Sequence, residues 1–309
     1  MTVPNGNGMK VMNGMDISVA GKIVRIARLS AEGYEFIDDP PSFISGITNN
    51  NIRADIFTFT QKLPDTEPRY GYPMEWDNVA ALPVTSYENW WTKQLNDKTR
   101  NMVRRAGKKG VVTKVVEFND EFATGISKIY NESPMRQGKP FWHYGKAFET
   151  VRRENATFPD RSCFIGAYFE NELIGFIKLV YETNFASMMQ IISMIKYRDK
   201  APTNKLVAKA VDICAERKIP YLVYAKFSAH GMKQRDSLSD FKHHNGFIKI
   251  DIPRYYVPLT IRGKIGLKLN LHLGIAKILP ENILIFLKDI RKKWYEKKWQ
   301  GEMTKGESQ

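Results

Sequence analysis

The sequence contains only two cysteines among its 309 residues, Cys163 and Cys214. Two thiols so far apart in the chain cannot build a disulfide framework or a thiolate metal site, and they indicate a reducing compartment. No stretch has the length of uninterrupted apolar sequence that a membrane-spanning helix needs, and the first 16 residues lack the apolar segment of a secretory signal. We therefore expect a cytoplasmic protein.

Acidic residues are also scarce relative to basic ones. The chain has 33 Asp and Glu against 47 Lys and Arg, which gives a formal net charge of +14. This excess indicates a negatively charged partner, and nucleic acid, an anionic membrane or a phosphorylated cofactor all qualify. The spacings of a Ser–His–Asp triad, a zinc site and a nucleotide-binding P-loop are absent too, so we expect no metal.

The chain does contain enough apolar sequence for a large core, because 43% of its residues are hydrophobic and 12% aromatic. We expect a flexible tail over residues 1–16 and a β-rich subregion over 17–84. An α/β core should occupy residues 85–260, followed by a basic helical extension over 261–309.

The core is organised around residues 162–227. Three short apolar runs, Cys163–Phe169, Leu173–Tyr181 and Phe185–Ile195, predict strands. The apolar spacing then becomes helical over 203–217, with Thr203 as the expected N-cap, and Tyr221–Phe227 predicts a further strand. The sequence therefore predicts a mixed sheet flanked by helices, with this helix on one face.

A basic helix is predicted before this core. It begins after Ser86, runs without interruption for about six turns and ends at Gly110. From Lys93 to Lys109 it carries seven Lys or Arg against one acid, Asp97. Two interpretations remain open: a solvated face whose cations suit a helix C-terminus, or a surface that faces phosphates.

The segment from Ser133 to Lys146 combines polar and aromatic residues in a loop. We expect it to line an acceptor pocket, with His143 as a candidate catalytic residue; the alternative is a loop that its aromatic rings pin to the core. The candidate substrate-binding residues are Arg136, Gln137, Lys139, Trp142 and Tyr144. His230 follows the strand Tyr221–Phe227, at the edge where open α/β sheets bind ligands, and it is the second candidate base.

Several motifs give the sequence a family resemblance. RNMVRRAGKKGV (residues 100–111), YNESPMRQG (130–138) and HNGF (244–247), in this order of elements, resemble the Fem-type peptidoglycan bridge aminoacyltransferases, a branch of the GNAT acyltransferase superfamily. The resemblance covers residues 90–260. It implies acyl transfer to an amine in a slot between two splayed parallel strands, here Phe185–Ile195 and Tyr221–Phe227.

The sequence differs from acyl-CoA-dependent GNAT enzymes in the loop before the central helix. That family carries glycines there, whose backbone N–H groups hold the pyrophosphate, whereas this loop reads KYRDKAPTN. The side chains that remain available for phosphate are Lys196, Arg198, Lys200, Thr203 and Asn204. Fem-type enzymes lack the glycines as well and use aminoacyl-tRNA. The resemblance therefore leaves the donor open between an acyl-CoA such as acetyl-CoA and an aminoacyl-tRNA.

Residues 261–300 mix apolar and basic side chains, including Trp294 and Trp299. Such a helix can lie on an anionic membrane, or it can dock on the protein with a basic outer face. A second hypothesis therefore stands beside the enzyme: a non-catalytic GNAT-like module that binds RNA or an anionic membrane through its basic surface.

Overall fold

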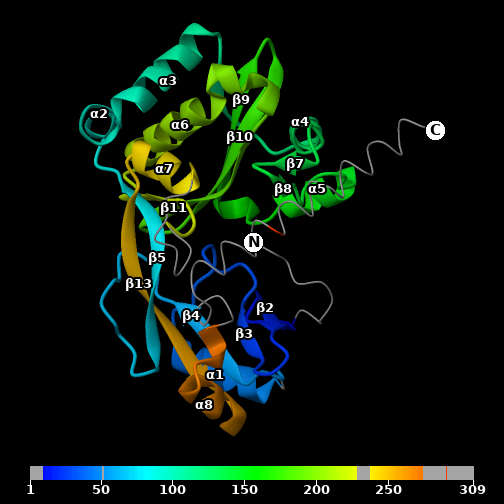
Figure 1. Cartoon of the computed structure of the whole chain (residues 1–309), viewed down its shortest axis with the longest axis vertical. Coiled ribbons are helices and arrows are strands. Elements are labelled where there is room, and N and C mark those ends of the chain that lie inside the picture. The colour runs from blue at the N-terminus through cyan, green and yellow to red at the C-terminus, as the bar shows by residue number, and fades with distance from the viewer. Residues whose placement is uncertain (1–9, 51, 228–236, 274–289, 291–309) are drawn as a thin grey trace, which may run out of the picture. The chain divides into compact units, whose positions relative to one another are not determined.

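The computed structural model describes residues 10–50, 52–227, 237–273 and 290. The chain divides into two compact units, and each is built from separate stretches of sequence. The first unit takes residues 1–81, 223–230 and 248–278, and the second takes 82–222, 231–247 and 279–309. Figure 1 labels elements of both units where there is room.

The first unit is a twisted sheet with one long helix. Its strands lie in the order β1-β2-β3-β4-β13-β5. The β3–β4 pair is parallel, whereas the β1–β2, β2–β3, β4–β13 and β13–β5 pairs are antiparallel, so the sheet is mixed. The elements are β1 (Lys10–Met12), β2 (Met15–Ala20), β3 (Ile26–Leu29), α1 (Pro40–Asn49), β4 (Ile56–Thr60), β5 (Met74–Pro83), β13 (Ile248–Pro258), α8 (Ile261–Lys268) and η4 (Leu271–Leu273).

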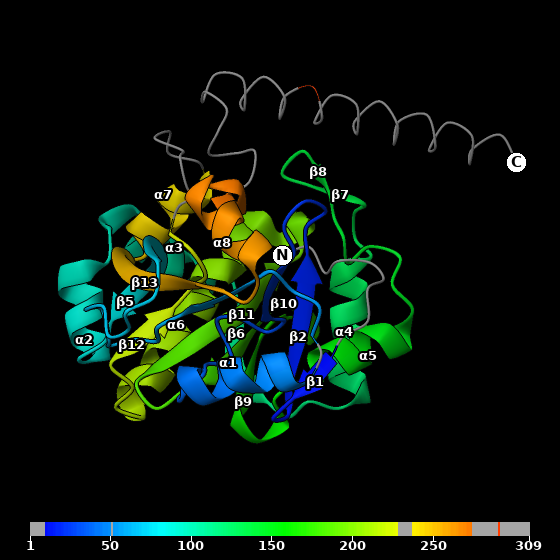
Figure 2. The ribbon, with the colours of Figure 1, turned by 90° about the horizontal axis from the view of Figure 1, so that it is seen from below.

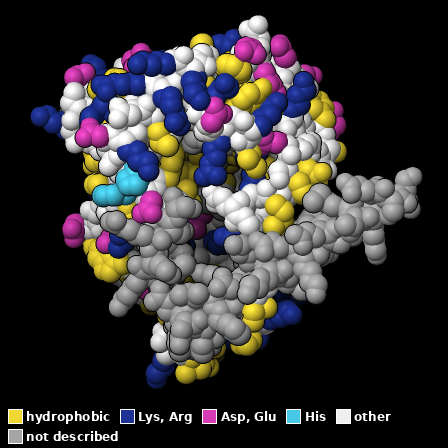
Figure 3. Space-filling model, turned by 45° about the horizontal axis from the view of Figure 1, so that its top comes forward, with side chains coloured by type: hydrophobic (Ala, Val, Ile, Leu, Met, Phe, Trp, Pro, Cys, Tyr) yellow, Lys and Arg dark blue, Asp and Glu magenta, His cyan; other side chains and the backbone are white. Residues whose placement is uncertain are grey.

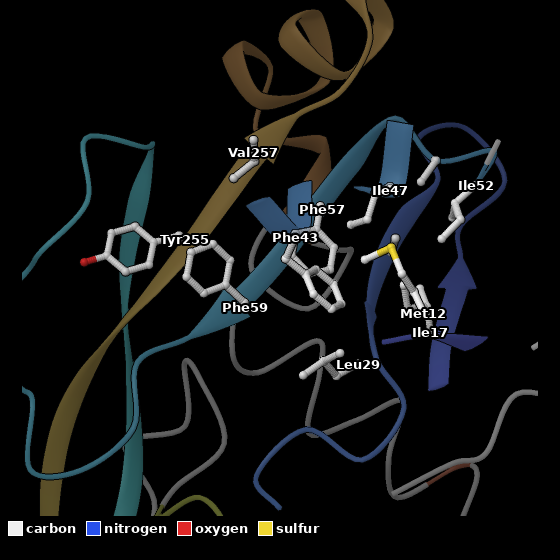
Figure 4. Close-up of a cluster of buried hydrophobic side chains, with 12 residues drawn as sticks. Met12, Ile17, Leu29, Phe43, Ile47, Ile52, Phe57, Phe59, Tyr255 and Val257 are labelled. Carbon is white, nitrogen blue, oxygen red and sulfur yellow. The ribbon is translucent and has the colours of Figure 1, made fainter. Parts of the chain in front are cut away.

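An aromatic core fills this unit between α1 and the sheet (Figure 4). Phe57 lies 5.6 Å from Phe43 of α1 and 5.9 Å from Phe59, measured between ring centroids. Phe59 in turn lies 5.2 Å from Tyr255 of β13. Strands β1 and β2 add Met12 and Ile17 to the same cluster, so the flexible tail expected over residues 1–16 does not reach as far as Lys10.

The second unit has a sheet in the order β12-β11-β10-β9-β6, and helices cover both of its faces (Figures 1 and 2). Helices α3 and α6 lie on one face and α4 and α5 on the other. The elements are α2 (Tyr87–Asn89), the π-helix η1 (Trp90–Gln94), α3 (Asp97–Lys108), β6 (Val112–Val116), α4 (Asp120–Tyr130), β7 (Met135–Arg136), β8 (Lys139–Pro140), α5 (Phe148–Asn155), η2 (Pro159–Arg161), β9 (Ser162–Phe169), β10 (Glu172–Tyr181), β11 (Phe185–Ser193), η3 (Ile195–Lys200), α6 (Pro202–Glu216), β12 (Tyr221–Val223) and α7 (Ser237–His244).

The central part of this unit confirms the prediction from the apolar runs. Strands β9, β10 and β11 form one antiparallel meander, and α6 packs on it. Glu170 and Asn171 make the tight turn between β9 and β10 with φ angles of 48° and 66°. These left-handed angles match the right-handed twist of a hairpin, which explains why two polar residues suffice there.

Two expectations were wrong. The helix predicted to begin after Ser86 and end at Gly110 is broken, because the chain is extended at Leu95. Asn96 begins a new helix there, since its side chain accepts a hydrogen bond from the N–H of Lys98 at 2.9 Å. The strand predicted over Tyr221–Phe227 ends at Val223. Beyond that residue, Tyr224 donates its N–H to Ala80 of β5.

Candidate functional site

The loop between β11 and α6 begins the central helix in an unexpected way. Ala201 is the N-cap, with a left-handed φ of 52°, and Pro202 occupies the first helical position. The expected N-cap, Thr203, lies inside the helix, and its hydroxyl is 2.7 Å from the Ser193 hydroxyl at the end of β11. The prediction for Thr203 was therefore wrong: the proline ring already fixes the first turn one residue earlier.

This helix start offers few N–H groups to a phosphate. Pro202 has none, and the N–H of Ala201 donates to the carbonyl of Arg198 at 3.1 Å. The N–H groups of Thr203 and Asn204 remain, because the first turn of a helix has no acceptor of its own for them. Two amides can hold one phosphate group, whereas the glycine-rich cradle of a diphosphate uses more.

The loop carries three basic side chains, Lys196, Arg198 and Lys200, which differ in their contacts and exposure. Lys196 forms an ion pair with Glu172 at 2.9 Å. Arg198 is exposed, and the Lys200 ammonium lies 4.0 Å from the centre of the Phe169 ring. The Asn204 side chain is buried. Arg198 and Lys200 are thus the predicted phosphate-binding side chains that a ligand at the start of α6 could reach with least rearrangement.

A carboxylate that the sequence analysis did not single out fixes the other end of the loop. Glu132 accepts hydrogen bonds from the N–H groups of Ile195 at 2.6 Å and Lys196 at 2.8 Å. It also pairs with the Arg136 guanidinium at 3.2 Å. The Glu132–Arg136 spacing of four residues, inside the YNESPMRQG motif, was a signal for this pair in the sequence.

Arg136 connects the predicted acceptor loop to the sheet. Its guanidinium donates to the carbonyl of Ser193 at 2.8 Å and to the carbonyl of Ile129 at 2.9 Å. The same group lies 4.6 Å from the centre of the Phe141 ring. Burial lowers the pKa of Arg136, and the neighbouring Glu132 opposes this shift. Arg136 is therefore built into the loop as a positioning residue.

The loop itself is a small hairpin that stands beyond α4 (Figure 2). Strands β7 and β8 pair in register, and Gln137 and Gly138 form the turn with φ angles of 53° and 68°. The side chains of Lys139, Trp142 and Tyr144 are exposed on this segment, and the Trp142 ring carries the Lys146 ammonium at 3.5 Å. These three side chains are accessible to a ligand.

His143 lies inside the loop and is only 4% exposed. Its ring stacks on Tyr130 of α4, with 4.1 Å between ring centroids, and lies tilted against the Trp142 ring at 4.0 Å. Burial, with a smaller contribution from the Lys146 charge, lowers the pKa of His143 to about 3. The imidazole is therefore neutral at physiological pH. His230, the other candidate base, lies outside the described residues.

Behind the loop lies a buried polar network. The Tyr130 hydroxyl donates to the Gln190 side chain of β11 at 2.9 Å, and the Asn155 amide of α5 lies 3.5 Å from the same hydroxyl. Lys178 of β10 donates to the Asn155 carbonyl at 2.8 Å, to the Thr157 hydroxyl at 2.8 Å and to the Thr157 carbonyl. This network ties α4, α5, β10 and β11 together behind the loop.

Lys178 is fully buried, and burial lowers its pKa to about 7. The sequence carried a signal for it, namely one lysine in the otherwise apolar run LIGFIKLVY. The pairing of β10 with β11 is also irregular at this point. Lys178 faces Gln190 while Leu179 faces Met188, so Met189 is an extra residue that bulges from β11.

The basic face of α3 belongs to the same unit. Arg104, Arg105, Lys108 and Lys109 are all exposed, and Lys109 pairs with Asp199 of the loop before α6 at 2.7 Å. Helix α3 packs against α6. Figure 3 shows Lys and Arg side chains gathered over the upper part of this view.

Among the described residues, no group of three or more His, Cys, Asp or Glu could hold a metal ion.

Comparisons with known proteins identify the fold. No protein-family model matches the sequence, and no curated protein matches it. Solved structures do match. FemX has a TM-score of 0.54 at 9% identity, over 79% of this chain and 86% of that one. The C-terminal domain of a putative lysylphosphatidylglycerol synthetase from Agrobacterium fabrum has a TM-score of 0.54 at 13% identity, over 82% and 83%.

A third match is L-PGS from Bacillus licheniformis, with a TM-score of 0.51 at 15% identity over 78% of this chain and 80% of that one. The chain therefore has a GNAT-like fold of the Fem type, as the sequence motifs indicated. In the described part of the chain, no helix combines the length and apolarity required to span a membrane.

Proposed function

We propose that this protein is an N-acyltransferase that moves an acyl or aminoacyl group from a phosphate-bearing donor to an amine. The observation that carries the proposal is the bulge at Met189 in β11, next to a neighbouring strand, β12, that ends at Val223. A bulge interrupts the ladder and leaves backbone groups of one strand unpaired. Unpaired backbone N–H groups are what acyl transfer needs to hold the carbonyl oxygen of the donor.

The reaction requires little machinery. The amine nitrogen attacks the donor carbonyl, the C–N bond forms, and the C–O or C–S bond to the donor breaks when the tetrahedral intermediate collapses. The amine loses a proton to a base or to water, and the leaving oxygen or sulfur takes one up. Positioning the two reactants can therefore supply much of the rate enhancement, without a metal or a covalent intermediate.

The loop from Ser133 to Lys146 serves as the acceptor side in this proposal. Lys139, Trp142 and Tyr144 present exposed side chains to the acceptor, and Gln137 lies at the exposed turn. His143 and Arg136 position the loop from beneath, through the stack on Tyr130 and the bonds to β11. Because a pKa of about 3 makes His143 a weak base, the proton of the amine passes to water or to His230 in this account.

Aminoacyl-tRNA is the donor that we propose. The start of α6 leaves the N–H groups of Thr203 and Asn204 for a phosphate, which suits a single phosphate better than the diphosphate of coenzyme A. The exposed cations of α3 continue the positive surface beyond the loop, as a long nucleic-acid backbone requires. Acyl-CoA remains the second candidate donor, because Arg198 and Lys200 lie at the loop where its phosphates would bind.

A side-by-side binding measurement tests the proposal. The purified protein is titrated with acetyl-CoA, with a mixture of aminoacyl-tRNAs and with the same tRNAs after removal of their amino acids. We expect the protein to bind aminoacyl-tRNA. We also expect the bound tRNA to lose its amino acid faster when an extract of cellular amines is added. Binding of acetyl-CoA instead would change the donor and keep the reaction. Binding of neither donor contradicts the proposal, and equal binding of both tRNA forms without turnover supports the non-catalytic module.

A further inference from the structure

Helix α8 packs on the first unit through glycines. An ideal Cβ placed on Gly263 would lie 1.9 Å from the carbonyl oxygen of Asp55, and one on Gly266 would lie 2.8 Å from a methyl group of Val24. No side chain fits in those spaces, so the helix backbone lies directly against the start of β4 and the turn before β3. The helix start is fixed as well. The Thr260 hydroxyl accepts a hydrogen bond from the N–H of Gly263 at 3.0 Å and donates one to the Asp55 carboxylate at 3.1 Å.

The consequence of this packing is that the large apolar side chains point outward. Ile261 and Ile265 of α8, and Leu269 directly after its last residue, follow one another at intervals of four residues, which places them on one face. They are 78%, 54% and 61% exposed. Single exposed aliphatic side chains are ordinary, but three on one face of α8 and its C-cap form an apolar ridge.

Cations flank this ridge. Arg262, Lys264 and Lys268 are exposed on the same helix, and the segment from Ile261 to Leu273 contains no acidic residue. The Asp55 carboxylate, which lies near Arg262, is itself buried and already bonded to Thr260 and to the N–H of Arg25. An apolar ridge between exposed cations is the pattern of a helix that lies in a membrane interface.

We propose that α8 is a docking surface for an anionic phospholipid bilayer, with Ile261, Ile265 and Leu269 entering the acyl boundary and Arg262, Lys264 and Lys268 meeting the headgroups. Charge disfavours two other partners for this surface, a second copy of the chain and the chain's own C-terminal segment. A second copy in a two-fold contact would bring the same three cations face to face. The C-terminal segment of this chain carries Lys288, Arg291, Lys292, Lys293, Lys297 and Lys298, which have the same sign as the helix.

Vesicle binding of the full-length protein tests this proposal. Co-sedimentation compares binding to vesicles of phosphatidylcholine alone with binding to vesicles of phosphatidylcholine and phosphatidylglycerol in equal parts. The charge variant R262Q/K264Q/K268Q should lose roughly a hundredfold in affinity for the anionic vesicles, because each cation near an anionic surface contributes a factor of about five. The apolar variant I261Q/I265Q/L269Q should lose about tenfold or more on the same vesicles.

The matched control is V112Q/V115Q, which replaces two exposed apolar side chains of β6 in the second unit. It should bind vesicles as the wild type does. Unchanged binding by both α8 variants would overturn the proposal and would assign any vesicle binding to another part of the chain. A wild-type dimer that the apolar variant converts to a monomer, with no vesicle binding by either, would overturn it in favour of a second copy.

A fluorescent label gives an independent readout. Both native cysteines are buried, so an Ile265→Cys substitution adds one accessible thiol to the protein. A polarity-sensitive dye on this thiol should shift to the blue when anionic vesicles are added, because the side chain enters the acyl boundary. The same dye at Val112→Cys should not respond. A dye at residue 265 that stays in a water-like environment on bound vesicles would contradict insertion of α8.

Discussion

The Arg136 guanidinium donates a hydrogen bond of 2.8 Å to the main-chain oxygen of Ser193. This contact joins the hairpin of β7 and β8 to the last residue of β11, so the predicted acceptor loop is attached to the strand that carries the bulge at Met189. The loop therefore has a fixed position relative to the end of β11 within the second unit, and changes at Arg136 should affect both.

Arg136→Ala should lower the free energy of unfolding by about 3 kcal/mol, because it removes a partly buried guanidinium and leaves Glu132 and two main-chain carbonyls without that donor. Donor turnover should fall as well, since the loop loses its attachment to β11. Chemical denaturation and a turnover assay measure the two effects.

The control for this substitution is Arg152→Ala. Arg152 also pairs with a carboxylate, that of Asp120, but both side chains are more than half exposed. Its loss should change stability by about 0.5 kcal/mol or less. Equal effects of the two arginine variants would contradict a structural role for Arg136.

Trp142 and His143 should respond differently to substitution. Trp142 is 52% exposed, so Trp142→Ala should cost about 1 kcal/mol or less in stability and act mainly on turnover. His143→Ala removes a buried ring that stacks on Tyr130, and it should cost about 3 kcal/mol. His143→Phe keeps the stack. If it keeps activity too, His143 positions the loop; full loss of activity in a stable Phe variant would make the imidazole nitrogen essential.

Lys178 should give the protein a pH-dependent stability. Its pKa falls from 10.5 to about 7 on folding because of burial. Between these two pH values the unfolded chain binds a proton that the folded chain has lost, so stability contributed by this group should rise with pH across that window and stay constant below it. Lys178→Met should flatten the rise, which denaturation at several pH values measures.

The comparison for this experiment is Lys114→Met, which changes an exposed lysine on another strand of the same sheet. Its stability should follow the wild-type pH profile. A Lys178→Met profile that also follows the wild type would mean that the three hydrogen bonds from the ammonium offset the cost of burial completely.

The basic face of α3 should control the salt dependence of tRNA binding. Binding a phosphate releases counterions, so the log–log slope of affinity against salt should become shallower by about one unit for each phosphate that R104Q/R105Q/K108Q/K109Q no longer holds. A matched set of four exposed cations in the first unit is changed in the control variant K10Q/K22Q/R28Q/R53Q. Equal slopes in both variants would remove α3 from the binding surface.

The fold could be predicted largely where local pattern decides it. Strands β9, β10 and β11 alternate with short polar turns, and α6 shows the helical period, so these elements follow from neighbouring residues. The break between η1 and α3 was missed because Asn96 lies within a continuous helical pattern, and only its capping bond begins a new helix there. The end of β12 was missed because Ala225 adopts a left-handed φ of 48°, which breaks the extended backbone inside a run whose composition favours a strand.

The site was predictable in its parts but not in its connections. The composition of the loop singled out Trp142 and His143, yet nothing in the sequence distinguishes the exposed ring from the buried one. Glu132 and Lys178 act through partners on other elements, at Ile195 and Asn155 respectively. Such contacts depend on how β10, β11 and α5 come together, and a single sequence does not contain that information directly.

We propose that the acyl group lies beside the bulge of β11 and faces the hairpin loop. Photo-crosslinking with an aminoacyl-tRNA whose amino acid carries a photoreactive side chain can locate it. After irradiation and proteolysis, we predict labelled peptides from β11 around Met189 and from the loop between Ser133 and Lys146. Labels confined to α3 or to the first unit, with β11 and the loop unmodified, would rule out this position of the acyl group.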